Sequence, residues 1–152
     1  MSQKIPGNGL TYGMDVGMTL LPFIGNPTFD AASQKIMVPI DTVGTTTDAP
    51  DLFYADVTYR RTVNSVTTTY AWIVFGPAPG DVTLPALPAE VGDVMPQATD
   101  TITGSFAGML ESDAVAGWDA ARPDVYSVQN NAINAPHPAA SRIRESTSGL
   151  LE

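Results

Sequence analysis

Cysteine is absent from the 152-residue sequence, and histidine occurs only once. The sequence therefore excludes disulfide bonds, thiolate metal sites and a cysteine nucleophile. The single histidine, His137, also excludes a three-histidine metal site, and it lies between prolines in an unpatterned stretch. A hydrolase would need either Ser105 beside His137 or two carboxylates that converge in a pocket. No motif spacing supports either arrangement, so no enzyme activity and no cofactor are expected.

Basic residues are scarce. Seven Lys plus Arg against 16 Asp plus Glu give a formal net charge of −9. Nucleic-acid binders need cations that neutralise phosphate, and anionic lipid surfaces repel an acidic chain, so neither is an expected partner. Charged residues make up 15%, below the roughly 25% of typical globular domains, and small hydroxyl residues, glycine and proline replace them. Such a composition is common in exported β-rich modules.

Long apolar runs are also missing. The best one, MTLLPFI at 18–24, is broken by Pro22 and is far shorter than the roughly 18 residues that span a bilayer. The start, MSQKIPGNG, lacks an apolar stretch after a basic residue, so it predicts no signal peptide. No direct membrane insertion is expected.

The length predicts one domain with a single core. We expect a flexible entry segment at 1–9 and one domain at 10–128. The residues at 129–150 are predicted to be a disordered tail or linker, because they show no hydrophobic period. The last two residues, 151–152, resemble a cloning scar, which suggests a domain excised from a larger protein.

The segment DLFYADVTYRRTVNSVTTTYAWIVFGP at 51–77 predicts a β-hairpin. Apolar and polar residues alternate over 53–60, and the second strand, at 67–75, is rich in β-branched and aromatic residues. A turn centred on Asn64 and Ser65 brings the apolar residues of both strands to one face. The predicted pairs are Val63 with Val66, Tyr59 with Tyr70, Val57 with Trp72, and Ala55 with Val74.

The rest of the chain carries shorter strand signals and no strong helix. Pro39 makes the run at 34–41 an edge strand or a strand end. An exposed edge at 35–40 could pair with another chain, and Pro39 would limit that pairing. In the strand predicted at 101–110, Ile102, Gly104, Phe106 and Gly108 should share one face. Further strands are expected at 10–24 and 125–128, an extended segment at 82–88, and a helical turn or long loop at 112–122. The prediction is an all-β fold, an antiparallel β-sandwich, with a small β-barrel as the alternative.

Aromatic residues offer two interpretations. Tyr59 and Trp72 share their face with a row of apolar residues, whose burial stabilises a domain by roughly 1.5–3 kcal/mol per large side chain, so they are interpreted as core. A carbohydrate-binding module could instead stack sugar rings on exposed aromatics. The candidates for polysaccharide binding are Tyr54, Trp118 and Tyr126.

Two loops carry carboxylates of the kind that bind calcium in β-rich domains. Asp48 and Asp51 flank one loop, and Glu111, Asp113 and Asp119 cluster in the other. Neither set matches the calcium-hand motif, so solvated loop acids and turn caps are the preferred interpretation. Calcium binding remains the alternative.

The segments WIVF at 72–75 and VTLPALP at 82–88, with SD at 112–113 and GWD at 117–119, resemble parts of a known class of domain. These are accessory β-sandwich domains of large bacterial secreted proteins and lipoproteins, of the immunoglobulin-like or carboxypeptidase-regulatory-like type. The Cys–Trp–Cys framework of antibody domains is missing. The resemblance implies a spacer, adhesion or stabilising module without catalytic residues, in the periplasm, on the outer surface or outside the cell.

From these observations we expect a non-catalytic structural or protein-interaction module of a larger exported bacterial protein. Its partners would be other domains of the parent protein or another surface protein. A carbohydrate-binding module is the alternative.

Overall fold

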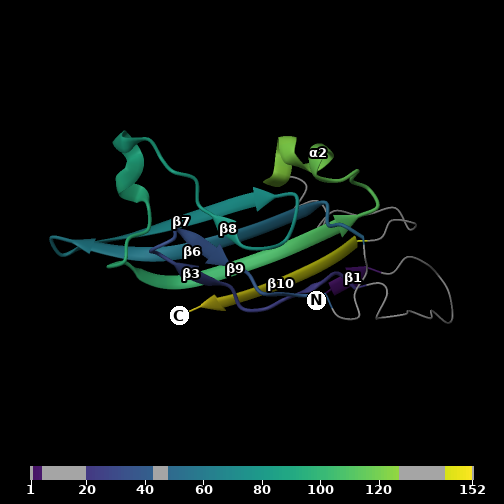
Figure 1. Ribbon diagram of the computed structural model, residues 1–152, viewed down its shortest axis with the longest axis horizontal. Helices are drawn as coiled ribbons and strands as arrows, with labels where there is room; N and C mark the ends of the chain where they lie inside the picture. The colour runs from purple at the N-terminus through teal and green to yellow at the C-terminus, as the bar shows by residue number, and fades with distance from the viewer. Residues whose placement is uncertain (1, 5–19, 43–47, 127–142, 152) are drawn as a thin grey trace.

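The computed structural model describes residues 2–4, 20–42, 48–126 and 143–151 of the chain (Figure 1). Its largest feature is a five-stranded antiparallel sheet, the main sheet, in which the order of strands is not the order of the sequence. Its strands are β1 (Ser2–Lys4), β6 (Leu52–Val63), β7 (Val66–Gly76), β9 (Thr101–Ser112) and β10 (Ile143–Leu151). They lie in the order β1-β10-β9-β6-β7, so β7 forms one edge.

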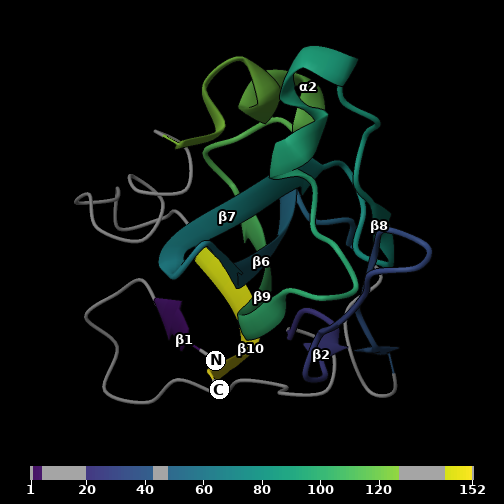
Figure 2. The same ribbon diagram turned by 90° about the vertical axis from the view of Figure 1, so that its left-hand side faces the viewer.

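Two small antiparallel sheets lie against one face of the main sheet, which Figure 2 shows from the end. The first contains β2 (Phe23–Ile24) and β5 (Ile40–Asp41). The second contains β3 (Thr28–Asp30), β4 (Lys35–Met37) and β8 (Val82–Thr83), with β4 in the middle. Among the described strands, no sheet closes into a barrel, so the small-barrel alternative does not describe this part of the chain.

Three short helical segments complete the described structure: η1 (Ala89–Val94), α2 (Trp118–Ala121) and η2 (Arg122–Asp124). Figures 1 and 2 show η1 and α2 projecting beyond β7, one near each end of that strand. Within the described ranges, no helix has both the length and the apolar character needed to cross a membrane.

The predicted hairpin is confirmed in its register. All four predicted pairs occur in the β6–β7 ladder, and the two turn residues both have a positive φ, 50° at Asn64 and 65° at Ser65. These values match a two-residue turn whose twist fits the strands that it joins. A one-residue slip would have turned the apolar row outward, so the alternation specified the pairing.

The core lies between the main sheet and the small sheets. We call the face of the main sheet that it covers the inner face. The buried residues of this cluster are Leu21, Ile24, Ile36, Val38, Phe53, Ala55, Val57, Leu84, Ala107 and Met109. Trp72, Val74 and Ile102 pack against them with partial burial.

The predicted tail at 129–150 is wrong over its last part, because β10 pairs with β9 along its whole length. Leu151, expected to be part of a cloning scar, is the last residue of this strand. The predicted entry segment at 1–9 is also wrong for β1, which pairs with β10. The other residues of these two segments, 1, 5–9 and 129–142, lie outside the described ranges.

Other strand predictions need smaller corrections. The run at 34–41 is split by Val38 and Pro39 into β4 and β5, and β4 is paired on both sides, so it is no free edge. Val125 and Tyr126 are helical, whereas a strand was predicted, and 127–128 lie outside the described residues. The predicted strand at 10–24 is described only from residue 20, where β2 is its short remainder. The helical turn expected at 112–122 is confirmed by α2.

A β-bulge changes the faces of β9. Thr58 pairs with Gly104 but Tyr59 pairs with Ile102, so Thr103 is the extra residue, and its Oγ1 donates to the Thr58 carbonyl at 3.3 Å. Ile102 therefore faces the core, contrary to the prediction that it shares a face with Gly104.

Candidate functional site

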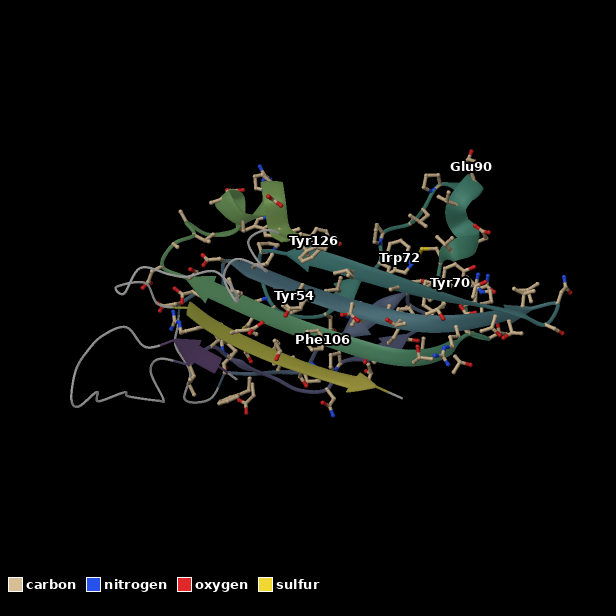
Figure 3. The ribbon with its side chains drawn as sticks, turned by 180° about the vertical axis from the view of Figure 1, so that it is seen from behind. Tyr54, Tyr70, Trp72, Glu90, Phe106 and Tyr126 are labelled. Carbon is tan, nitrogen blue, oxygen red and sulfur yellow. The ribbon has the colours of Figure 1, made fainter. Side chains whose placement is uncertain are left out.

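The inner-face aromatics hold the connection between β8 and β9 in place. Tyr59 is fully buried, and its hydroxyl donates to the carbonyl oxygen of Val94 at the end of η1. The indole N–H of Trp72 lies 3.3 Å from the same oxygen. Figure 3 shows Trp72 and Tyr70 beneath η1. The interpretation of Tyr59 and Trp72 as structural residues is confirmed, because both anchor a loop in addition to packing on the core.

Arg61 anchors the same connection. Its guanidinium forms a two-pronged contact with Asp100, at 2.8 Å from Nε and 2.6 Å from Nη2, and also donates to the carbonyls of Asp93 and Met95. The bond from Arg61 keeps the pKa of Asp100 below its usual range. The Arg61 guanidinium therefore has a structural role, since Asp100 and two backbone carbonyls accept its hydrogen bonds.

The opposite side of the main sheet, the outer face, carries a row of aromatic rings. Tyr54 lies 5.8 Å from Phe106 and 6.2 Å from Phe75, and Phe75 meets Tyr126 edge-on at 5.2 Å (ring centroids). Figure 3 shows Tyr54 and Phe106 over the middle of the sheet, with Tyr126 towards α2. Tyr54 is the most buried ring of the row, Phe75 and Phe106 are partly buried, and Tyr126 at the α2 end is exposed.

Two glycines let these rings lie against the sheet. A Cβ built at Gly108 would collide with the Tyr54 ring, and would be 2.7 Å from Cε1. A Cβ at Gly149 would collide with the ring of Phe106 and lie 3.2 Å from the Ser105 carbonyl oxygen. Neither glycine has a positive φ, so space for a ring, rather than backbone conformation, is what they supply.

Asp56 occupies the open part of the outer face. It lies in β6 between Ile73 of β7 and Phe106 of β9, and Tyr54 and Thr58 precede and follow it on the same face. No hydrogen bond or ion pair joins its carboxylate to any other described residue. Burial raises the pKa of Asp56 from 3.8 to about 6. A carboxylate in the middle of a sheet, next to apolar side chains, is costly unless it meets a partner.

The second perturbed acid on this face is Glu145 of β10. Burial raises its pKa, and the hydrogen bond from the Tyr54 hydroxyl opposes that shift. The registers place Glu145 two strands away from Asp56 and four residues further along, about 16 Å between backbone positions. The two carboxyls of a glycosidase must lie roughly 5–9.5 Å apart, so this pair does not match that chemistry.

The three sugar-binding candidates differ in their accessibility. Tyr54 is only 5% exposed, so its ring offers no stacking surface. Trp118 is half-buried against Leu52 and Leu110. Tyr126 is 57% exposed at the end of the aromatic row. The structure therefore brings Tyr54 and Tyr126 into one row through Phe75, but it exposes only Tyr126.

Asp51, a predicted calcium ligand, instead holds the turn after β9. Its carboxylate accepts hydrogen bonds from the backbone N–H groups of Ser112 at 2.6 Å and Gly117 at 2.9 Å. Burial raises its pKa, although these two hydrogen bonds act in the opposite direction. This is the turn-capping role that was the preferred interpretation.

Two other calcium candidates, Glu111 and Asp48, converge on Arg144. Its Nε donates to Glu111 at 2.6 Å and its Nη2 to Asp48 at 2.7 Å. Asp113 and Asp119 are exposed. In the part of the chain that the structure describes, no group of three or more His, Cys, Asp or Glu side chains could hold a metal ion.

No described contact supports the hydrolase hypothesis. The Ser105 hydroxyl is buried on the inner face and donates to the Pro27 carbonyl oxygen at 2.6 Å. His137 lies outside the described residues.

Sequence reasoning missed Asp56 and Arg144 as residues of interest. The signal for Asp56 was present, because an acid stood at the centre of a strongly predicted strand. No comparable signal marked Arg144, since its segment was interpreted as a tail. Comparison of the chain with protein-family models, with curated proteins and with solved structures finds no match.

Proposed function

We propose that this chain is a non-catalytic structural or protein-interaction module of a larger exported bacterial protein. Its architecture would be a β-sandwich of the immunoglobulin-like type, and its contact surface the open part of the outer face around Asp56. The layering of the small sheets on the inner face and the hydroxyl-rich, cysteine-free composition support this proposal. Other domains of the parent protein or another surface protein would supply the partner.

One observation carries the proposal. A carboxylate stands in the interior of the outer face between Ile73 and Phe106, and none of its four neighbours on that face is charged. Among the residues whose side chains the structure describes, the other charged groups on this face are Arg60, four residues along β6, and Glu145 on β10. Positions that lower the stability of the free protein are typical of functional surfaces. Ile73, beside it, is 47% exposed, so the surface is accessible from β7.

Replacing Asp56 with asparagine is expected to raise the free energy of unfolding at pH 7 by about 1–2 kcal/mol. A pKa raised by about two units corresponds to about 3 kcal/mol, which partial solvation of the side chain reduces. Because the folded-state pKa is raised, ionisation destabilises the folded state as the pH rises from 4 to about 6. The difference between variant and wild type should therefore vanish near pH 4. Urea denaturation at both pH values measures it.

Asp93→Asn is the matched control, because Asp93 is exposed on η1 and its substitution should change stability little at either pH. If Asp56→Asn lowered the stability at pH 7, the carboxylate would serve the fold, and the proposed contact role would be lost.

The carbohydrate-binding alternative is supported by the exposed ring of Tyr126 alone. Soluble xylan and β-glucan are expected to leave the tryptophan fluorescence unchanged, including that of Trp118 near the aromatic row. A polysaccharide-dependent shift that Tyr126→Ala abolishes would make sugar binding the working function.

A further inference from the structure

Among the described strands, β7 has no partner on its outer side, and this edge is long, regular and uncharged. Its 11 residues, VTTTYAWIVFG, include no charged residue and no proline, and they pair with β6 without a bulge. Sheets usually protect their edges with charges, prolines, bulges or very short strands. At the opposite edge of the main sheet, the described part of β1 has 3 residues and pairs with Ile143, Arg144 and Glu145 of β10. The edge of β7 has none of these protections.

The hairpin turn determines which backbone groups of β7 point outward. Val63 and Val66 flank a two-residue turn, so they form a hydrogen-bonded pair, and every second residue of β7 after Val66 also bonds to β6. The intervening residues direct their N–H and C=O groups to the edge: Thr67, Thr69, Ala71, Ile73 and Phe75. Among the described residues, nothing accepts from or donates to these outward groups.

The surroundings of this edge are acidic. The two projecting segments beyond β7 carry Glu90 and Asp93 on η1, and Asp119 and Asp124 on α2 and η2 (Figures 1 and 2), against one cation, Arg122, which pairs with Asp119. Asp56 lies one strand inward from Ile73. A strand added to β7 would place a side chain about 10 Å from the backbone of Asp56, a gap that the long side chain of lysine or arginine can bridge. A second copy of this chain, with its own net charge of −9, would instead bring acid against acid.

We propose that the β7 edge accepts an extended segment of another protein by strand addition, and that this segment carries a lysine or arginine opposite Ile73. The inference rests on the proposed interaction function and names the chemistry of the partner. Backbone hydrogen bonds to the outward groups give affinity, and Asp56 selects the basic side chain.

Amide hydrogen exchange followed by NMR tests this inference with two synthetic probes. Both are end-blocked peptides of alternating threonine and valine, one with a central lysine and the other with a central glutamate. Before addition, the outward amides of Thr69, Ala71 and Ile73 should exchange at least about tenfold faster than those of Tyr70 and Trp72. The lysine peptide should slow the outward amides, and the glutamate peptide should bind about fivefold more weakly. In Asp56→Asn the two peptides should differ less than about twofold.

Substitutions on β7 provide the backbone test. Ala71→Pro removes an outward N–H without removing a hydrogen bond to β6, so it should abolish protection by the lysine peptide. Ala71→Ser keeps the N–H and is the matched control. If Ala71→Pro fails to fold, Ile73→Lys serves in its place, because the added cation lies next to Asp56 and should remove the preference for the lysine peptide.

Three results would overturn the inference. The lysine peptide could leave the outward amides unprotected, or both peptides could bind equally to the wild type. Sedimentation could also reveal a dimer whose β7 amides are protected without any peptide, which would assign the edge to a second copy. If Asp56→Asn stabilises the protein as expected while the peptides fail, this inference falls and the proposed interaction function stands.

Discussion

Replacing Arg144 with methionine is expected to lower the free energy of unfolding by about 3–5 kcal/mol. Arg144 is 2% exposed and bonds to Glu111 at 2.6 Å and to Asp48 at 2.7 Å. Glu111 is itself buried, at 8% exposure, so the variant would leave a carboxylate in the interior without its cation. Chemical denaturation at pH 7 measures the loss.

Two companion variants separate the buried ion pair from a general effect of losing arginine. Arg122 pairs with Asp119 at 3.6 Å, and both side chains are mostly exposed, so Arg122→Met should cost less than about 0.5 kcal/mol. Adding Glu111→Gln to Arg144→Met should recover part of the loss, because the uncompensated charge is removed. Equal effects of Arg144→Met and Arg122→Met would contradict a buried role for Arg144 and for the strand that carries it.

The hairpin was predictable because its determinants are local. Alternation along 53–60 assigned the faces, and Asn64 and Ser65 assigned a turn that tolerates a positive φ. Together these signals predicted four residue pairs between the two strands, and all four occur in the β6–β7 ladder. No distant residue was needed for that inference.

β10 was not predictable from the same signals. Its central residues, RESTSG at 144–149, are polar or small, and the inward positions carry Arg144 and Ser146. Such a pattern has no apolar period, so it resembled a tail. It becomes a strand because β9, more than 30 residues away in the sequence, pairs with it and because Glu111 and Asp48 neutralise its buried cation. The bulge at Thr103 was missed for a similar reason, since only the pairing with β6 reveals it.

The outer face was predicted in part. Tyr54 was predicted to be a candidate exposed aromatic, and its burial under its neighbours was not foreseen. The alternation along one strand predicts which face of the sheet a side chain occupies. It does not predict which residues of the neighbouring strands lie beside that side chain. The glycines of β9 and β10 decide this, because they sit directly beside the rings of Tyr54 and Phe106.

Replacing Gly108 with alanine is therefore expected to lower the free energy of unfolding by about 2–3 kcal/mol. The new methyl group would overlap the ring of Tyr54, which packs on Phe106 and Phe75 and bonds to Glu145, so the ring has little freedom to move. A loss of that size is separated easily from experimental error in urea denaturation.

Gly76→Ala is the matched control for this substitution. Gly76 ends β7 and has no heavy atom within 4 Å of a built Cβ, so its alanine variant should change stability by less than about 0.5 kcal/mol. In the background of Tyr54→Ala, the ring is gone, and Gly108→Ala should be neutral or stabilising by about 0.5 kcal/mol, because alanine loses less backbone entropy than glycine. The same penalty in both backgrounds would mean that the backbone at Gly108, and not the tyrosine ring, requires glycine. A penalty that disappears with the ring would show that Gly108 is retained so that Tyr54 can close the aromatic row.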